Sequence, residues 1–144
     1  MQLEYYSLPL SLERIMNRQE HPKISMQQSV LQHLHLLITT AFGEFPADQD
    51  FGSSIWDYDF DNVTSAHKLK ELIRQSLLQA IQRYEKRLSN IRVELMILQE
   101  ELQERSKAGS RIKKRIDISV TGILISTNER LNFRDSFFVG PLSY

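Results

Sequence analysis

Carboxylates are the side chains of this sequence whose spacing could support catalysis. Glu44 is followed by Asp48 and Asp50, and the surrounding segment 44–62 contains no lysine or arginine. A pair of carboxyl groups about 5–10 Å apart, with the pKa of one raised, can cleave a glycosidic bond. Glu44 with Asp48 or Asp50 is therefore a candidate carbohydrate-cleaving pair. Clustered loop acids are more often solvated or cap helices, so we expect no catalytic residues.

Metal, thiol and cofactor chemistry has less support. The chain has no cysteine, which excludes thiol nucleophiles, disulfides and cysteine-bound zinc. His33 and His35 lie two positions apart in a segment with helical periodicity, so they point to different faces, unlike metal ligands spaced by four. The five glycines form no phosphate-binding loop. The sequence predicts no metal site, no cofactor and no small-molecule substrate.

Six basic residues cluster in the last third of the chain. As a nucleic-acid site this cluster is weak, because no aromatic residues interleave and the whole chain has 18 basic and 18 acidic residues. It is more typical of a solvated hairpin tip or a strand edge protected by charge, and it could attract an acidic protein partner. The six are Arg105, Lys107, Arg111, Lys113, Lys114 and Arg115.

Two helices are expected to position these groups. Apolar residues recur every three or four positions over 26–42, after a Ser25–Gln28 pair typical of a capping box. Gly43 suits the C-terminus of that helix. The same period predicts a second helix over 64–88. Between the two helices, the acidic loop has aromatic rings that we expect to be buried, and a helical turn is expected near 54–58.

After the second helix the hydrophobic period changes to two. Three alternating runs, at about 91–97, 112–120 and 131–139, predict an antiparallel sheet with a turn at Asn128. Helices followed by strands indicate an α+β fold, in which the N-terminal helices pack on a C-terminal antiparallel β-sheet.

The domain organisation is expected to be simple. The length fits one domain, 1–144, with residues 1–24 as a loosely ordered N-terminal arm and residues 25–140 as the folded body. No apolar run approaches the roughly 20 residues of a membrane span, and the first residues do not resemble a secretion signal. We therefore expect a cytoplasmic protein without membrane insertion.

Two passages resemble the motifs of a known family. Residues 36–55 read LLITTAFGEFPADQDFGSSI, which is similar to the T-x-x-G-E-R-x-x-x-x-x-F-G-x-x-L pattern of the phage-baseplate wedge family that includes the type VI secretion protein TssE, long labelled lysozyme-like. Residues 84–88 read YEKRL, which is similar to the family's Y-E-P-R-L element. Phe45 replaces the family's arginine, and Lys86 replaces its proline. Because lysine keeps its N–H, we expect the helix to continue through Lys86.

The resemblance implies a structural protein and not an enzyme. Members connect the baseplate wedge to the first ring of a contractile sheath, so sheath subunits and other wedge proteins are the implied partners. Their C-terminal sheet would template sheath growth by accepting a partner strand at an open edge. Glu44, Glu85 and Arg87 are implied as partner-binding residues. Register at the partner strand would come from Ile116, Ile118 and Val120.

Several interpretations remain open at this stage. The chain could belong to a phage tail, a type VI secretion system or an extracellular contractile particle, assembled in the cytoplasm into a baseplate. The alternatives are a lysozyme-like enzyme that uses the acids after Gly43, or a small cytoplasmic adaptor. For Glu85 and Arg87, the alternative to a partner contact is a plain surface pair at the end of the helix, which would contribute about 0–1 kcal/mol.

Overall fold

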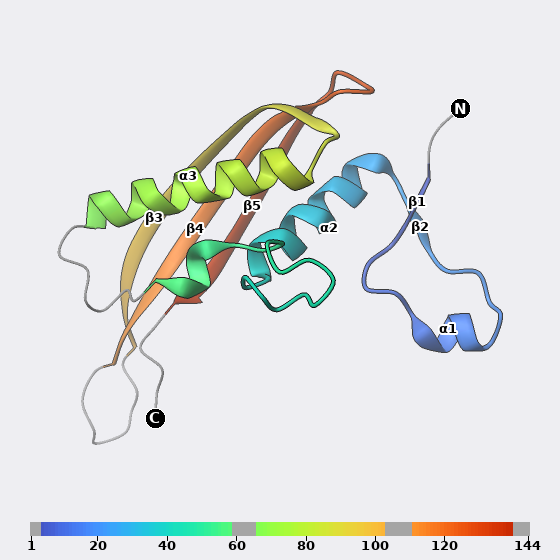
Figure 1. Ribbon diagram of the computed structural model, residues 1–144, viewed down its shortest axis with the longest axis horizontal. Helices are drawn as coiled ribbons and strands as arrows, with labels where there is room; N and C mark the ends of the chain where they lie inside the picture. Colours follow the sequence, from blue (N-terminus) through green and yellow to red (C-terminus); the bar gives the residue numbers. More distant parts are fainter. Residues whose placement is uncertain (1–3, 59–65, 103–110, 140–144) are drawn as a thin grey trace.

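The structure confirms the α+β class. The computed structural model describes residues 4–58, 66–102 and 111–139. Two long helices form one layer and a three-stranded antiparallel sheet forms the other, with the strand order β3-β4-β5 (Figure 1). In chain order the elements are β1 (Tyr5–Tyr6), α1 (Leu12–Met16), β2 (Lys23–Ile24), α2 (Met26–Thr39), the 3₁₀ turn η1 (Ser54–Asp57), α3 (Ala66–Tyr84), β3 (Leu88–Leu102), β4 (Arg111–Leu124) and β5 (Arg130–Val139).

Helix α2 begins as predicted and ends earlier than predicted. The side chain of Ser25 accepts the N–H of Gln28, whose own side chain accepts the N–H of Ser25, so the capping box is confirmed. The helix ends at Thr39 instead of residue 42. Thr40 is extended and donates its hydroxyl to the carbonyl of Leu36 at 2.6 Å, which competes with continued helix.

Helix α3 also ends earlier than predicted, at Tyr84 instead of residue 88. The N–H of Glu85 makes the last helical contact, to the carbonyl of Ile81 at 2.8 Å. Leu88 is already the first residue of β3 and is 5% exposed. The expectation that the helix continues through Lys86 was therefore wrong, because burying Leu88 in the sheet requires extended backbone before the next helical turn.

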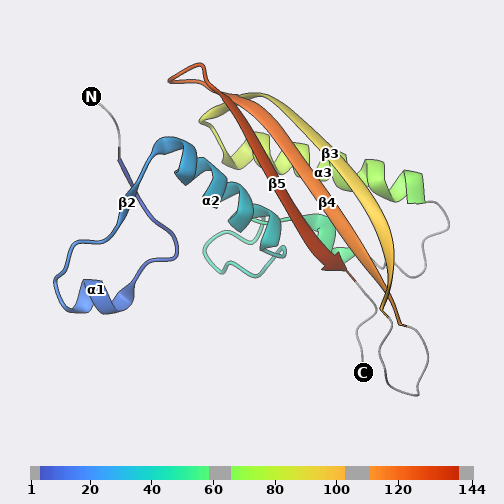
Figure 2. The same cartoon turned by 180° about the vertical axis from the view of Figure 1, so that it is seen from behind.

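The sheet buries one face and leaves the other open among the described residues. Both helices pack on the same side, and Figure 2 shows the sheet from its uncovered side, with α3 behind it and α2 alongside β5. Strand β5 alternates buried and exposed residues as predicted, and Asn128 has the positive φ of +58° that suits its turn. The buried residues of the sheet are Leu88, Val93, Leu95, Ile116, Ile118, Val120, Leu124, Leu131, Phe133 and Val139.

Strands β3 and β4 continue together beyond the end of β5. The last pair between β4 and β5 is Lys114 with Val139, whereas the pairing of β3 with β4 reaches Leu102 with Arg111. Four residues of the basic cluster lie on β4, namely Arg111, Lys113, Lys114 and Arg115. Arg105 and Lys107 lie outside the described residues.

The N-terminal arm has more regular structure than expected. Strands β1 and β2 pair antiparallel around the short helix α1, and this unit stands to one side of the main sheet (Figure 1). Gln32 of α2 holds it: its Oε1 accepts the N–H of Leu8 at 2.8 Å and its Nε2 donates to the hydroxyl of Ser7 at 3.3 Å. No residue of α1 is buried, so the arm is attached by polar contacts without a core of its own.

Candidate functional site

An ion pair closes the junction between α3 and β3. The carboxylate belongs to Glu85, which is 2% exposed. Arg87 donates to it from Nε to Oε1 at 2.8 Å and from Nη2 to Oε2 at 2.9 Å, which is bidentate geometry. The backbone N–H of Arg87 also donates to Oε1, at 3.0 Å. The two residues that the motif singled out, Glu85 and Arg87, therefore contact each other within this chain.

Helix α2 and the arm complete this junction. The Nδ1 of His33 lies 2.7 Å from Oε2 of Glu85, and Nη1 of Arg87 donates to the hydroxyl of Ser29 at 2.9 Å. The guanidinium of Arg87 also stacks over the ring of Tyr5, 5.0 Å from its centroid. The junction thus ties together β1, α2, α3 and β3, which lie far apart in the sequence. We call these five residues the junction network.

The electrostatics of the network favour the charged state of both partners. Burial alone would raise the pKa of Glu85, but hydrogen bonds from His33 and Arg87 outweigh it and lower that pKa to about 2. The hydrogen bond to Glu85 raises the pKa of Arg87, against the effect of burial. A general acid near neutral pH needs a raised pKa, so Glu85 is unsuited to that role.

This geometry argues against the alternative of a weak, exposed pair at the end of the helix. Glu85 has no surface to offer a partner directly, whereas the side chain of Arg87 is 28% exposed. Sequence reasoning missed Ser29 and His33. Their signal was present, because residues four apart share one face of a helix, and a hydroxyl and an imidazole beside the apolar stripe of α2 indicate a buried polar partner.

The loop before η1 packs on the same junction. The ring of Phe51 lies 6.0 Å from His33 in a stacked arrangement and 5.1 Å from Tyr84 edge to face. The helical turn expected near 54–58 is present as η1. Burial of the aromatic rings is only partial, since Phe45 is 47% and Trp56 is 39% exposed. Phe60 lies outside the described residues.

The acids of this loop have structural partners. Glu44 is exposed, and its Oε2 accepts the N–H of Ala41 at 2.8 Å. Asp48 accepts the hydroxyl of Tyr84 at 2.9 Å. Burial and this hydrogen bond raise the pKa of Tyr84. Asp50 lies 3.5 Å from Arg83. The contacts of Asp48 and Asp50 hold the loop on α3.

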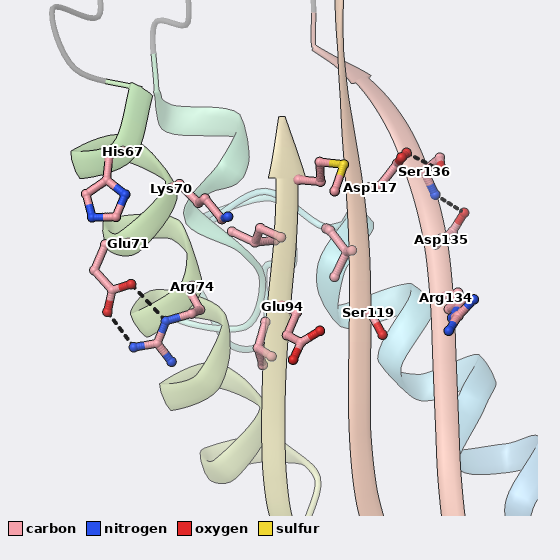
Figure 3. A pocket seen from close by; sticks show the side chains of 14 residues that line it. His67, Lys70, Glu71, Arg74, Glu94, Asp117, Ser119, Arg134, Asp135 and Ser136 are labelled. Atoms are coloured by element: carbon pink, nitrogen blue, oxygen red, sulfur yellow. Dashed lines mark hydrogen bonds and ion pairs between the residues drawn. The ribbon is translucent and has the colours of Figure 1, made fainter. Parts of the chain in front are cut away.

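A groove of about 980 Å³ lies elsewhere, lined by α3 and by residues of all three strands, β3, β4 and β5 (Figure 3). Its helical wall includes His67, Lys70 and the Glu71–Arg74 ion pair. None of the three candidate carbohydrate-cleaving acids lines it. Within residues 4–58, 66–102 and 111–139, no three His, Asp or Glu side chains gather in a way that could hold a metal ion.

The three predicted strand residues lie on β4, with exposed fractions of 0%, 2% and 0% for Ile116, Ile118 and Val120. Because β4 is the central strand, its backbone is paired on both sides. They are therefore core residues of this sheet, and pockets for a partner strand at these positions are not available on the surface.

Fold and site together define a small α+β protein whose charged motif joins its own helices to its sheet. Residues 24–129, more than half of the chain, match the model of the family described as baseplate wedge protein gp25. The chain belongs to the gp25 family of baseplate wedge proteins. Membership makes it a baseplate wedge component of a contractile machine, with other baseplate proteins as its partners.

A solved structure agrees with the fold. It is the crystal structure, at 1.44 Å resolution, of a Geobacter sulfurreducens protein provisionally described as a tail lysozyme. It superimposes with a TM-score of 0.55 at 24% identity, covering 83% of this chain and 96% of that chain. A search of the curated proteins found no significant match. Across the part of the chain that the structure describes, no helix is long and apolar enough to cross a bilayer.

Proposed function

We propose that this chain connects the baseplate wedge to the first ring of a contractile sheath and templates sheath growth by strand addition at β5. One observation carries the proposal: within the described residues, β5 is paired only to β4 and forms an edge of the sheet. An edge strand presents unpaired N–H and C=O groups to an incoming strand. Strand β5 offers ten residues, enough for a stable addition.

The register identifies which backbone N–H groups of β5 face away from β4. The N–H of Leu124 donates to the carbonyl of Glu129 at 2.8 Å, so these residues face each other as a hydrogen-bonded pair. Hydrogen-bonded pairs alternate along an antiparallel ladder, and the register is regular through β5. The backbone N–H groups of Asn132, Arg134 and Ser136 therefore point away from β4. Their side chains lie on the uncovered face of the sheet.

Edge strand β5 suits addition better than β3. Helix α3 packs along β3 more extensively than any other helix packs on a strand. Helix α2 meets β5 through fewer contacts, near Asp135 and Phe137. A partner strand at β5 would extend the sheet without displacing α3. The buried residues Ile116, Ile118 and Val120 would serve this surface indirectly, by holding the central strand on which β5 pairs.

The wedge would contact a separate surface, around the junction network. Glu85 would act there by fixing the helix-to-strand turn, while Arg87, half-buried, and Glu44, exposed, would remain accessible to a neighbour. Lys86 is exposed at the centre of the turn. A wedge protein with an acidic surface would complement this position.

A matched pair of variants tests strand addition. Arg134→Pro removes one outward N–H from β5 without removing a bond to β4, whereas Arg134→Ala removes the same side chain and keeps the N–H. Tagged chains would be recovered from their native cells, and bound proteins identified by mass spectrometry. We expect Arg134→Ala to recover a sheath subunit and wedge proteins, and Arg134→Pro to recover wedge proteins alone. Equal sheath recovery by both variants would contradict addition at β5.

A separate variant tests the proposed contact with the wedge. Lys86→Glu reverses a charge at the exposed turn and leaves β5 unchanged, so we expect it to lower recovery of wedge proteins. The identity of the recovered sheath would also distinguish a phage tail from a type VI secretion system or an extracellular contractile particle. Recovery of neither sheath nor wedge proteins would favour a small adaptor instead.

A further inference from the structure

One carboxylate occupies the open edge of β5. Asp135 is the only polar residue among the positions of β5 that face the helices. Its Oδ1 accepts the backbone N–H of the next residue, Ser136, at 2.8 Å. Figure 3 shows this contact on the outermost strand of the sheet. That N–H is one of the donors that the ladder directs away from β4. The carboxylate therefore fills the place that a neighbouring strand's carbonyl would take.

Contacts from two other elements hold this arrangement. The Nδ1 of His35, on α2, lies 2.6 Å from the other oxygen of Asp135, Oδ2. On the uncovered face, the hydroxyl of Ser136 donates to Oδ1 of Asp117 on β4, at 2.7 Å (Figure 3). The hydrogen bond from Ser136 lowers the pKa of Asp117. Ser136 is thus held by one carboxylate at its backbone and by a second at its side chain.

We propose that Asp135, positioned by His35, prevents the edge of β5 from pairing with a second copy of this chain. We call Asp135 with its bond to Ser136 the guard. Two identical edges pair antiparallel about a two-fold axis. The register centred on residue 135 would place two carboxylates opposite each other, which is unfavourable. Each copy would also have to break its bond between Asp135 and Ser136. Inward-facing charges at edge strands are an established means of preventing such pairing.

The guard also has a consequence for assembly, and this part of the inference rests on the proposed function. A sheath strand that adds at β5 must displace Asp135 from the N–H of Ser136. A partner with a cationic side chain near that position could retain the carboxylate after displacement. The edge of β5 in the free protein would then remain unpaired until a sheath strand binds. Asp135 lies beyond residues 24–129, so the match to the family model does not include it.

Three variants test the guard without any partner protein. Asp135→Ala frees the N–H of Ser136, and we expect it to self-associate over a concentration series in analytical ultracentrifugation while the unchanged chain stays monomeric. Glu94→Ala removes an exposed carboxylate from β3 and leaves the contacts of Asp135 and Ser136 unchanged, so it should stay monomeric. Adding Arg134→Pro to Asp135→Ala should restore the monomer. A monomeric Asp135→Ala variant that folds like the unchanged chain would overturn the proposal.

Amide hydrogen exchange on the unchanged chain gives a second test, which does not depend on the folding of any variant. The amides of Asn132, Arg134 and Ser136 all point to the open edge, but only that of Ser136 has a charged acceptor among the described residues. We expect it to exchange roughly ten-fold more slowly than the amide of Arg134. Equal exchange rates for the two amides would overturn the proposal. Neither test involves a sheath, so a failure of strand addition in the cell experiment would leave both results unaffected.

Discussion

Arg87 donates two side-chain hydrogen bonds to Glu85, although only Lys86 separates the two residues in the chain. Residues two apart on a helix point to different sides, so this contact can form only where the helix has ended. The end of α3 and the ion pair are therefore one feature. Removing the ion pair should loosen the turn, and extending the helix should break the ion pair.

The first prediction concerns the stability of the isolated chain. Glu85→Ala leaves Arg87 and His33 without their buried acceptor, and we expect it to lower the free energy of unfolding by about 3 kcal/mol. Denaturant unfolding followed by circular dichroism measures this. Lys86→Ala, at the exposed neighbour, is the control and should change stability by less than about 0.5 kcal/mol. A Glu85→Ala chain as stable as the control would favour the alternative of a weak surface pair.

The second prediction concerns acid. The pKa of Glu85 is about 2 in the folded chain, against an ordinary value of 4.5. A carboxyl group whose pKa is lowered by folding stabilises the fold at pH values above its ordinary pKa. This contribution is lost as the pH falls from about 4.5 towards 2. The difference corresponds to at most about 3 kcal/mol. Stability measured across this range should fall more steeply in the unchanged chain than in Glu85→Gln, and parallel curves would contradict the prediction.

The third prediction concerns the N-terminal arm. Gln32→Ala removes both contacts that the side chain makes to Ser7 and Leu8, so the arm should detach more often. The loss of about 1 kcal/mol of hydrogen bonding predicts roughly five-fold faster proteolysis within residues 4–24. Gln27→Ala, at an exposed position of the same helix, is the matched control. Limited proteolysis with mass spectrometry gives the rates, and equal rates would show that other contacts hold the arm.

The fourth prediction compares two glycines. A Cβ added at Gly52, where φ is +141°, would lie 2.6 Å from the backbone oxygen of Thr40. At Gly43, φ is +81° and no atom lies within 4 Å of the added Cβ. We expect Gly52→Ala to cost about 3 kcal/mol and Gly43→Ala about 1 kcal/mol, because only the first combines a strained φ with a backbone clash. Thermal unfolding separates them, and equal midpoints would contradict the clash.

Local patterns were enough to predict the layers of this fold. The capping box at Ser25, the apolar stripes of both helices and the alternation in β5 each depend on residues close in sequence, and the structure confirms all three. The helix ends were wrong by three or four residues. At those positions, competition from a threonine hydroxyl and the burial of Leu88 outweighed helical propensity, and neither effect shows in periodicity.

The site was predicted less well because its contacts are long-range. The resemblance singled out Glu85 and Arg87, but burial of Glu85 depends on His33, more than fifty residues earlier. The strand residues Ile116, Ile118 and Val120 have the pattern of any half-buried strand, and only the strand order shows that theirs is central. Asp135 is the one polar residue in its alternating run, but its hold on the edge requires His35 and the register of β5.

The order of elements along the chain has a consequence for synthesis on the ribosome. Every strand of the three-stranded sheet follows residue 87, whereas α2 and α3 precede it. The apolar faces of both helices therefore emerge with no sheet to cover them, and they must wait for the last third of the chain. The sheet itself joins consecutive strands and can pair as soon as it emerges. Its completion is the step that shields the helices from aggregation.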